Sequence, residues 1–203
     1  MSRPAIFLDR DGVLVEEIYY PHTSEWEAPL VPQDVRLLPG AAAATARLAA
    51  AGYALVLISN QAAYAKGKAD LRTLWLAHER FIALMRSEGV EFQGIYYSYS
   101  HPRGIVKHFS GSSLERKPSP YNLLVASAQL DLDLSRSWLI GDRETDVLCA
   151  RAAGVKPILI YNAHSACSDD LSDHKFANLD DAAEFILAGV SGANSHSESE
   201  KLQ

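Results

Sequence analysis

Two carboxylates separated by one residue follow directly after a short apolar run near the start of the chain. Asp9 and Asp11 flank Arg10, and Gly12 lets the backbone turn tightly after them. At this spacing one carboxylate can act as a nucleophile while the other serves as an acid toward the leaving oxygen. Such a turn is also typical of a solvated loop, but the continuously apolar run 5–8 before it favours a site.

Polar residues follow two further apolar runs of strand length. Ser59 comes directly after the run 53–58, and Asp142 comes shortly after the run 138–140. Ligands of an open parallel sheet bind beyond the carboxyl ends of its strands. We therefore expect Ser59 and Asp142 to converge with the carboxylate pair in one site.

The elements that position these residues alternate in type along the chain. Apolar runs of strand length alternate with longer stretches of helical period, which is typical of a parallel sheet built from right-handed crossovers. The predicted class is α/β, with a three-layer sandwich around a parallel sheet. Strands are expected over 5–8, 53–58, 92–97, 138–140 and 157–161. Helices are expected over 40–51, 71–87, 120–130, 146–153 and 180–188.

The length of the chain, and the lack of any linker-like segment that would divide it, predict a single domain over residues 1–188 of the 203. Residues 98–116 show no clear period, and a loop of that length in a compact domain is usually functional or mobile. Residues 189–203 are rich in Ser, Glu and His and are expected to form a disordered tail.

Composition excludes several classes of protein. Hydrophobic residues make up 48% and charged residues 22%, as in ordinary globular proteins. The net charge is −6 without any basic block, so no nucleic-acid partner is expected. No signal peptide and no membrane-spanning run is recognisable. Cys149 and Cys167 form no CxxC pair, which fits a reducing cytoplasm, and a monomer is expected.

Four ordered motifs resemble those of the haloacid dehalogenase superfamily. They are Phe7-Leu8-Asp9-Arg10-Asp11-Gly12, Ile58-Ser59-Asn60-Gln61, Arg116-Lys117-Pro118 and Gly141-Asp142-Arg143-Glu144-Thr145-Asp146. The resemblance covers roughly residues 4–188 and implies the Rossmann-like fold of that superfamily. The short inserts at 13–38 and 61–115 indicate a member without a separate cap domain.

The resemblance implies a phosphatase that works through an aspartyl-phosphate. Asp9 would be the nucleophile and Asp11 the general acid and base. Ser59 would donate a hydrogen bond to the phosphoryl group, and Lys117 would offset its charge. A magnesium ion would be held by Asp9, the Asp11 backbone carbonyl and Asp142.

Asp146 has two interpretations at this stage. It can support the site without binding the metal, or it can be a carboxylate that is favoured by the dipole at a helix N-terminus.

Within the superfamily the motifs are similar to those of the heptose-bisphosphate and histidinol-phosphate phosphatases. Ile95-Tyr96-Tyr97 and the flanking lengths resemble the D-glycero-D-manno-heptose 1,7-bisphosphate 7-phosphatase branch more than the histidinol-phosphatase branch. A small phosphorylated sugar is the expected substrate. Its predicted contacts are Asn60, Gln61, Lys66 and Arg116.

The chain departs from this branch where a zinc ion is usually bound by three cysteines and a histidine. Those ligand positions fall on Ser98, Ser100, Ser113 and Glu115, and neutral hydroxyls bind zinc poorly. No zinc is therefore expected. His101 and His108 together with Glu115 are an alternative ligand set, and their other interpretation is packing of the loop or contact with a substrate phosphate.

The insert at 19–31 is rich in aromatic residues. It can wall the sugar pocket, or its rings can simply pin the loop to the domain.

Other functions remain open at this stage. They are a phosphatase for histidinol phosphate or another small metabolite, a non-catalytic phosphate-binding module and a polynucleotide end phosphatase. Intact Asp9, Asp11, Lys117 and Asp142 disfavour the second, and the lack of a basic channel disfavours the third.

Overall fold

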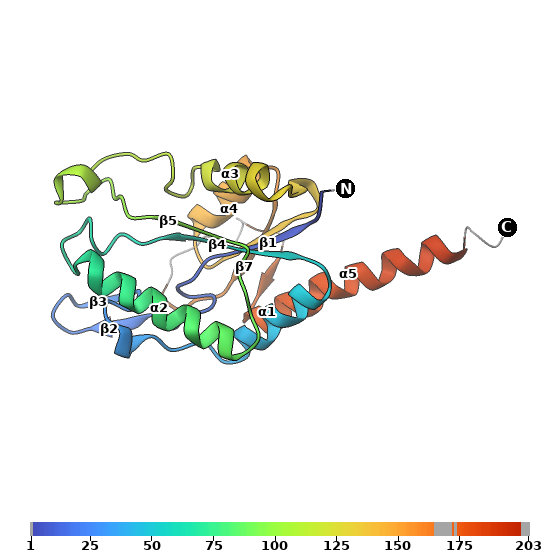
Figure 1. Cartoon of the computed structure of the whole chain (residues 1–203), viewed down its shortest axis with the longest axis horizontal. Coiled ribbons are helices and arrows are strands. Elements are labelled where there is room, and N and C mark those ends of the chain that lie inside the picture. Colours follow the sequence, from blue (N-terminus) through green and yellow to red (C-terminus); the bar gives the residue numbers. More distant parts are fainter. Residues whose placement is uncertain (1, 165–171, 173, 200–203) are drawn as a thin grey trace.

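The computed structural model describes residues 2–164, 172 and 174–199. At its centre lies a parallel six-stranded sheet in the order β5-β4-β1-β6-β7-β8 (Figure 1). Its strands are β1 (Ala5–Leu8), β4 (Ala54–Asn60), β5 (Gly94–Ser98), β6 (Trp138–Gly141), β7 (Lys156–Ile160) and β8 (Lys175–Phe176). The three central strands β4, β1 and β6 therefore carry the three predicted polar strand ends.

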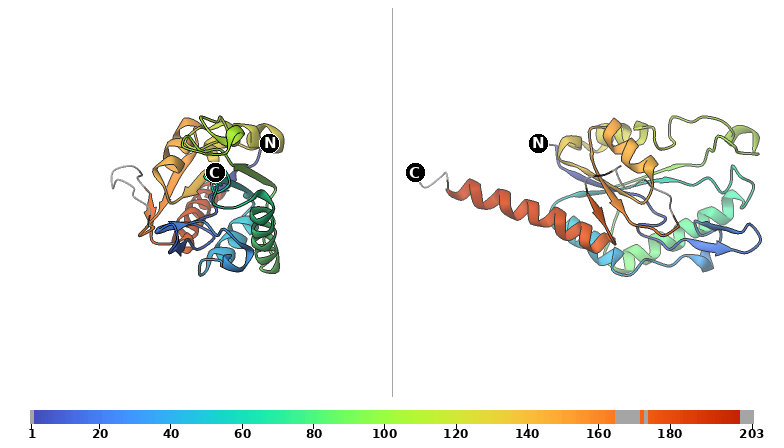
Figure 2. Two further views of the ribbon diagram at one scale, coloured as in Figure 1. Left: turned by 90° about the vertical axis from the view of Figure 1, so that its left-hand side faces the viewer. Right: turned by 180° about the vertical axis from the view of Figure 1, so that it is seen from behind.

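Helices cover both faces of the sheet and complete the three layers (Figures 1 and 2). One face carries α1 (Ala41–Ala50), α2 (Leu71–Ser87) and α5 (Leu179–Ser199). The other carries α3 (Tyr121–Leu130) and α4 (Glu144–Ala152). Short 3-10 helices lie at η1 (Pro32–Asp34), η2 (Lys107–Phe109) and η3 (Leu134–Arg136). The predicted α/β class and three-layer arrangement are confirmed.

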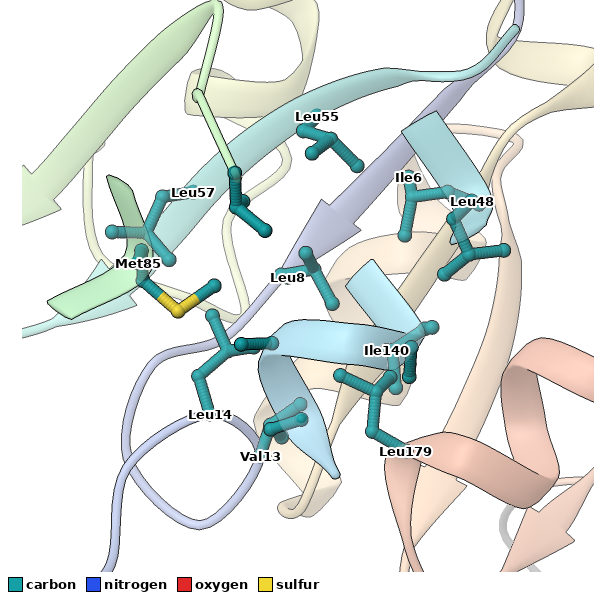
Figure 3. Packing of buried hydrophobic residues seen from close by; sticks show 14 of the residues in the cluster. Ile6, Leu8, Val13, Leu14, Leu48, Leu55, Leu57, Met85, Ile140 and Leu179 are labelled. Carbon is teal, nitrogen blue, oxygen red and sulfur yellow. The ribbon is translucent and has the colours of Figure 1, made fainter. Parts of the chain in front are cut away.

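Strand β1 is buried along its whole length and ties the two halves of the core together. Ile6 and Leu8 pack with Leu48 of α1 in the larger cluster (Figure 3). Ala5 and Phe7 point to the opposite face and pack in the cluster that includes α3 and α4. Each buried leucine or phenylalanine side chain stabilises the fold by about 1.5–3 kcal/mol. The residues that follow β1 are therefore attached to a rigid part of the core.

A small antiparallel hairpin stands between β1 and α1 in place of a separate cap domain. Its strands are β2 (Ile18–Tyr20) and β3 (Glu25–Glu27), which the sequence did not predict. Tyr20 holds its base, because the Tyr20 hydroxyl donates to Asp34 Oδ2 over 2.6 Å and accepts from Leu30 N over 2.9 Å.

Helix α5 ends later than the sequence predicts. A disordered tail was expected from Gly189, but the helix runs to Ser199 and projects away from the sheet (Figures 1 and 2). An isolated glycine inside a helix costs only about 1 kcal/mol, so Gly189 does not by itself end it. The remaining tail positions, 200–203, lie outside the described residues, as does Cys167.

In the described part of the chain, no helix combines the length and the apolarity that a bilayer crossing requires.

Candidate active site

Asp9 stands at the carboxyl end of β1 as a buried carboxylate with fixed partners. It is 6% exposed, and Arg10 N donates to Asp9 Oδ1 over 2.7 Å. Lys117 Nζ lies 2.9 Å from Asp9 Oδ2. Burial alone would raise the pKa of Asp9, but Lys117 and a hydrogen bond from Ser59 bring it below its ordinary value. Asp9 is therefore ionised at neutral pH, as a nucleophile must be.

Lys117 is fixed beside Asp9 by a set of oxygen atoms. Its ammonium group donates to the Ile58 carbonyl over 2.9 Å and lies 2.5 Å from Asp146 Oδ1. Burial lowers the pKa of Lys117, but Asp146 and Asp9 raise it by more, so the group stays charged. The Asn60 side chain pairs with the Lys117 backbone N and O at 3.0 and 3.1 Å. The positive charge predicted beside the nucleophile is present, and Asn60 helps to place it.

Three buried carboxylates converge at this point. Asp9, Asp142 and Asp146 each offer an oxygen atom, and these atoms lie within 4.8 Å of one another. No other group of three metal-binding side chains occurs among the described residues. Carboxylate oxygens are the ligands that Mg²⁺ prefers, so the donor set fits a hard divalent cation. Burial raises the pKa of Asp146, which is paired with Lys117 and also accepts from Arg143 N at the start of α4 over 3.1 Å, so its contacts fit both of its predicted interpretations.

Two glycines allow these carboxylates to approach the backbone closely. Gly12 has a φ of 79°, and a Cβ at this position would overlap the side chains of Asp142 and Asn162. A Cβ at Gly141 would overlap the side chain of Asp146. Only glycine fits either position.

Asp142 is oriented by residues that the sequence did not single out. Asn162, just beyond β7, donates through Nδ2 to Asp142 Oδ2 over 2.9 Å and to Glu17 Oε2 over 3.0 Å. The buried carboxylate of Glu17 also accepts from Arg143 over 2.6 Å. Asn162 could have been found from the sequence, because it follows the predicted strand 157–161, much as Asp142 follows the predicted strand 138–140.

Asp11 is bonded to two buried polar side chains. Arg10 Nε lies 2.9 Å from Asp11 Oδ1, and Gln61 Nε2 donates to Asp11 Oδ2 over 2.6 Å. Gln61 also donates to Ser59 Oγ over 3.0 Å. Gln61 was predicted to contact substrate, but it is 4% exposed and lies behind Asp11 and Ser59.

These groups open into a cavity of about 570 Å³. Seven of the nine predicted site residues line it: the substrate contacts Asn60, Lys66 and Arg116 and four catalytic residues, whereas Gln61 and Asp142 do not. The four are Asp9, Asp11, Ser59 and Lys117. The cavity is large enough for a small phosphorylated metabolite.

The hairpin β2–β3 forms part of one wall of the cavity, and the interpretation that this wall faces a sugar stays a prediction. Trp26 and Glu27 line the space, and the Trp26 ring stacks on His164 at 3.7 Å between centroids. Lys68 forms ion pairs with Glu25 and Glu27 and so ties β3 to the chain that follows β4. Trp26 also contacts Tyr19 within the hairpin, and it is the stacking of Trp26 on His164 that holds the loop against the rest of the domain.

Lys66 and Arg116 are the predicted distal cations, and both line the cavity. Among residues 2–164, 172 and 174–199 neither forms a close ion pair with a carboxylate, although Glu25 and Glu27, which pair with Lys68, attract Lys66 from a longer distance. Burial and the nearby charge of Lys68 lower the pKa of Lys66, and burial and Arg143 lower the pKa of Arg116. The Arg116 guanidinium donates to the Ser100 carbonyl over 3.0 Å. Half-buried cations without close carboxylate partners are ready to bind an anion.

The loop 98–116 is held by hydrogen bonds and a ring contact. The Ala65 carbonyl accepts from Ile105 N over 2.7 Å and from Val106 N over 3.2 Å. Phe109 packs edge-on against Tyr64 at 4.9 Å. The alternative metal set of His101, His108 and Glu115 is not among the groups whose ligand atoms converge in the described chain. The expectation that the loop holds no zinc stays a prediction.

The chain is similar in sequence to proteins of a known family. Residues 114–183 match the model of HAD-hydrolase-like proteins. The D-glycero-D-manno-heptose-1,7-bisphosphate 7-phosphatase of Thermosynechococcus vestitus is 36% identical over 97% of this chain and 98% of its own. The D-glycero-beta-D-manno-heptose-1,7-bisphosphate 7-phosphatase of Escherichia coli K12 is 35% identical over 76% of both chains.

Solved structures show the same similarity. A putative HAD-like phosphatase from Mesorhizobium loti superposes with a TM-score of 0.76 at 27% identity, covering 91% of this chain and 86% of its own. The D,D-heptose 1,7-bisphosphate phosphatase of B. bronchiseptica, complexed with magnesium and phosphate, has a TM-score of 0.73 at 26% identity. That match covers 92% of this chain and 99% of the other.

Proposed function

The chain belongs to the haloacid dehalogenase superfamily, in the family of its heptose-bisphosphate phosphatase relatives, and we propose that it removes the 7-phosphate of D-glycero-D-manno-heptose 1,7-bisphosphate. One observation carries the proposal. The buried pair of Asp9 and Lys117 opens into a cavity whose lining also offers Lys66 and Arg116, neither of which forms a close ion pair. Such a cavity suits a substrate with two phosphates.

In the proposed reaction Asp9 attacks phosphorus, and the bond from phosphorus to the sugar oxygen breaks. Asp11 gives its proton to that oxygen. Water then attacks the aspartyl-phosphate, passes a proton to Asp11 and releases phosphate and free Asp9. Lys117 and the Ser59 hydroxyl face the phosphoryl oxygens and stabilise the charge that develops on them.

Asp9, the Asp11 backbone carbonyl and Asp142 would hold the magnesium ion. The ion would reduce the repulsion between the phosphate and Asp9, both of which are anions. The convergence of the carboxylate oxygens supports this assignment. The magnesium-bound relative from B. bronchiseptica supports it as well.

The test is phosphate release, with magnesium and with EDTA, from a panel of both heptose 1,7-bisphosphate anomers, histidinol phosphate and common hexose phosphates. We expect a magnesium-dependent preference for a heptose bisphosphate. Asp9→Asn should lower kcat by about 10⁴-fold or more because the nucleophile is lost. Asp131→Asn, at the end of α3, is the matched control and should keep full activity. A fully active Asp9→Asn enzyme would exclude the mechanism, and activity confined to another phosphate would exclude the substrate.

The second phosphate should be recognised by Lys66 and Arg116. Replacing either with Met removes a cation that has no close carboxylate partner, so KM for the bisphosphate should rise about 10- to 100-fold. KM for a heptose monophosphate should change far less. Lys107→Met removes a cation from the same loop outside the cavity lining and serves as the control. Equal effects on both substrates would contradict this role.

A further inference from the structure

Arg10 is a buried cation beside Asp11, next to the cavity. It is 4% exposed and does not line the cavity. Its guanidinium contacts both oxygens of Asp11, with Nε 2.9 Å from Oδ1 and a terminal nitrogen 3.3 Å from Oδ2. A second contact from that nitrogen reaches Gln61 Oε1 over 2.7 Å. A planar guanidinium in this geometry fixes the rotation of a carboxylate.

Gln61 links Arg10, Asp11 and Ser59 through the two ends of its amide group. Its Oε1 accepts from Arg10, while its Nε2 donates to Asp11 Oδ2 and to Ser59 Oγ. The orientation of the Gln61 amide is thereby fixed, because a flipped amide would place a donor against Arg10 and an acceptor against Asp11. Gln61 therefore couples the position of Asp11 to that of Ser59, which itself bonds to Asp9.

The Arg10 guanidinium is itself held by an aromatic ring. The ring of Tyr97 on β5 lies under the guanidinium, with 5.8 Å between the Arg10 carbon and the ring centroid. The Tyr97 hydroxyl lies 3.0 Å from His78 Nδ1 on α2. A chain of buried polar contacts thus runs from Asp11 through Arg10 and Tyr97 to His78, so the orientation of Asp11 is set by the sheet and by α2.

We propose that Arg10 and Gln61 are positioning residues that hold Asp11 for both of its proton transfers. The inference rests on the proposed function. It assigns Gln61 to Asp11 and Ser59 instead of to the substrate, because Gln61 is buried behind both and is absent from the cavity lining. In the first step the proton of Asp11 goes to the leaving oxygen, and in the second a proton returns to it from water. A displaced Asp11 slows both transfers.

The test uses p-nitrophenyl phosphate and a heptose bisphosphate with the full-length magnesium-loaded enzyme. The nitrophenolate leaving group departs without a proton, so only the second step with this ester needs Asp11. In Gln61→Met the rate of the p-nitrophenol burst should change far less than the steady rate. The steady rate that follows should fall about 10- to 100-fold. With the sugar phosphate kcat should fall by a similar factor while KM stays within about twofold.

Arg10→Lys is the second variant and should show the same pattern, because the ammonium group cannot make the two-point contact with Asp11. Gln129→Met, which loses only a surface bond to Tyr96, is the control and should match the wild type. Thermal unfolding of each variant checks that it is folded. A raised KM at unchanged kcat, or a burst slowed as much as the steady rate, would overturn the inference. A wild type inactive on every ester would instead count against the proposed function.

Discussion

At the scale of single residues, the site depends on side chains that hold other side chains. Asp142 is 1% exposed, and its orientation is set by Asn162, which also bonds to the buried Glu17. Partners of metal-binding carboxylates contribute strongly to metal affinity, because they fix the direction of the ligand oxygen. Asn162 is therefore expected to matter for metal binding without touching the metal.

We expect Asn162→Ala to weaken metal binding by about 10- to 100-fold. The substitution removes the donor shared by Asp142 and Glu17 and leaves two buried carboxylates less well bonded. Calorimetric titration with Mg²⁺ or resonance detection of bound Mn²⁺ measures the effect without any substrate. Asn178→Ala removes an equivalent amide bonded to the exposed Asp181 and should leave the affinity unchanged. An unchanged affinity in Asn162→Ala would contradict the role.

The sequence predicted those residues of the site that directly follow a strand, because the end of a strand indicates where they lie in the sheet. Asp9, Ser59 and Asp142 all follow central strands, and the structure places them together. The direction in which a side chain leaves a turn is not encoded in spacing. For that reason the sequence did not indicate that Gln61 bonds to Asp11 and Ser59, or that Arg10 contacts Asp11 and Glu17 bonds to Asn162.

At the scale of elements, long periodic segments were predictable and short ones were not. Helix α2 has the bounds expected from its apolar period, 71–87. Strands β2 and β3 have three residues each, too few to show an alternation, and Glu25 and Glu27 are poor strand formers. The hairpin is stabilised by the tertiary contacts of Lys68 and His164, which lie far from it in the sequence.

The packing of α2 against β5 gives stability a pH dependence. Burial and the charge of Arg10 lower the pKa of His78 below its ordinary value. As the pH falls below about 6.5, the unfolded chain takes up a proton that folded His78 does not accept, so unfolding becomes easier. The contribution of His78 to stability is therefore present above that pH and is lost as the pH falls toward the pKa of His78 in the folded protein.

We expect the free energy of unfolding to fall with decreasing pH below about 6.5, by at most about 1.4 kcal/mol per pH unit for this one proton. In His78→Gln, which can still bond to the Tyr97 hydroxyl, this part of the slope should vanish. Urea unfolding of both proteins at a series of pH values measures the difference. Parallel slopes in the two proteins would exclude His78 as the cause.

At the scale of the whole molecule, the loop 98–116 is integrated with the domain through protein contacts. Backbone bonds to the Ala65 carbonyl and the packing of Phe109 on Tyr64 hold it against the chain after β4, and the bond from Arg116 to Ser100 joins its two ends. These contacts join the two segments that line the cavity with Lys66 and Arg116.

Protein prepared without chelators is therefore expected to contain far less than one zinc ion per chain. A zinc-selective chelator should leave Tm unchanged, because domains that depend on zinc lose stability when it is removed and this loop has other partners. Elemental analysis and a thermal scan measure both quantities. Stoichiometric zinc would contradict the prediction.

The placement of the cavity between the sheet and the hairpin has a consequence for local opening. Strand β1, which carries Asp9, is buried at every residue, so its amide hydrogens should exchange with solvent only when the whole domain unfolds. The hairpin has short, largely exposed strands, so its amides should exchange through small local fluctuations. The wall that the hairpin contributes to the cavity should therefore fluctuate locally, while the carboxylates at the end of β1 keep their positions.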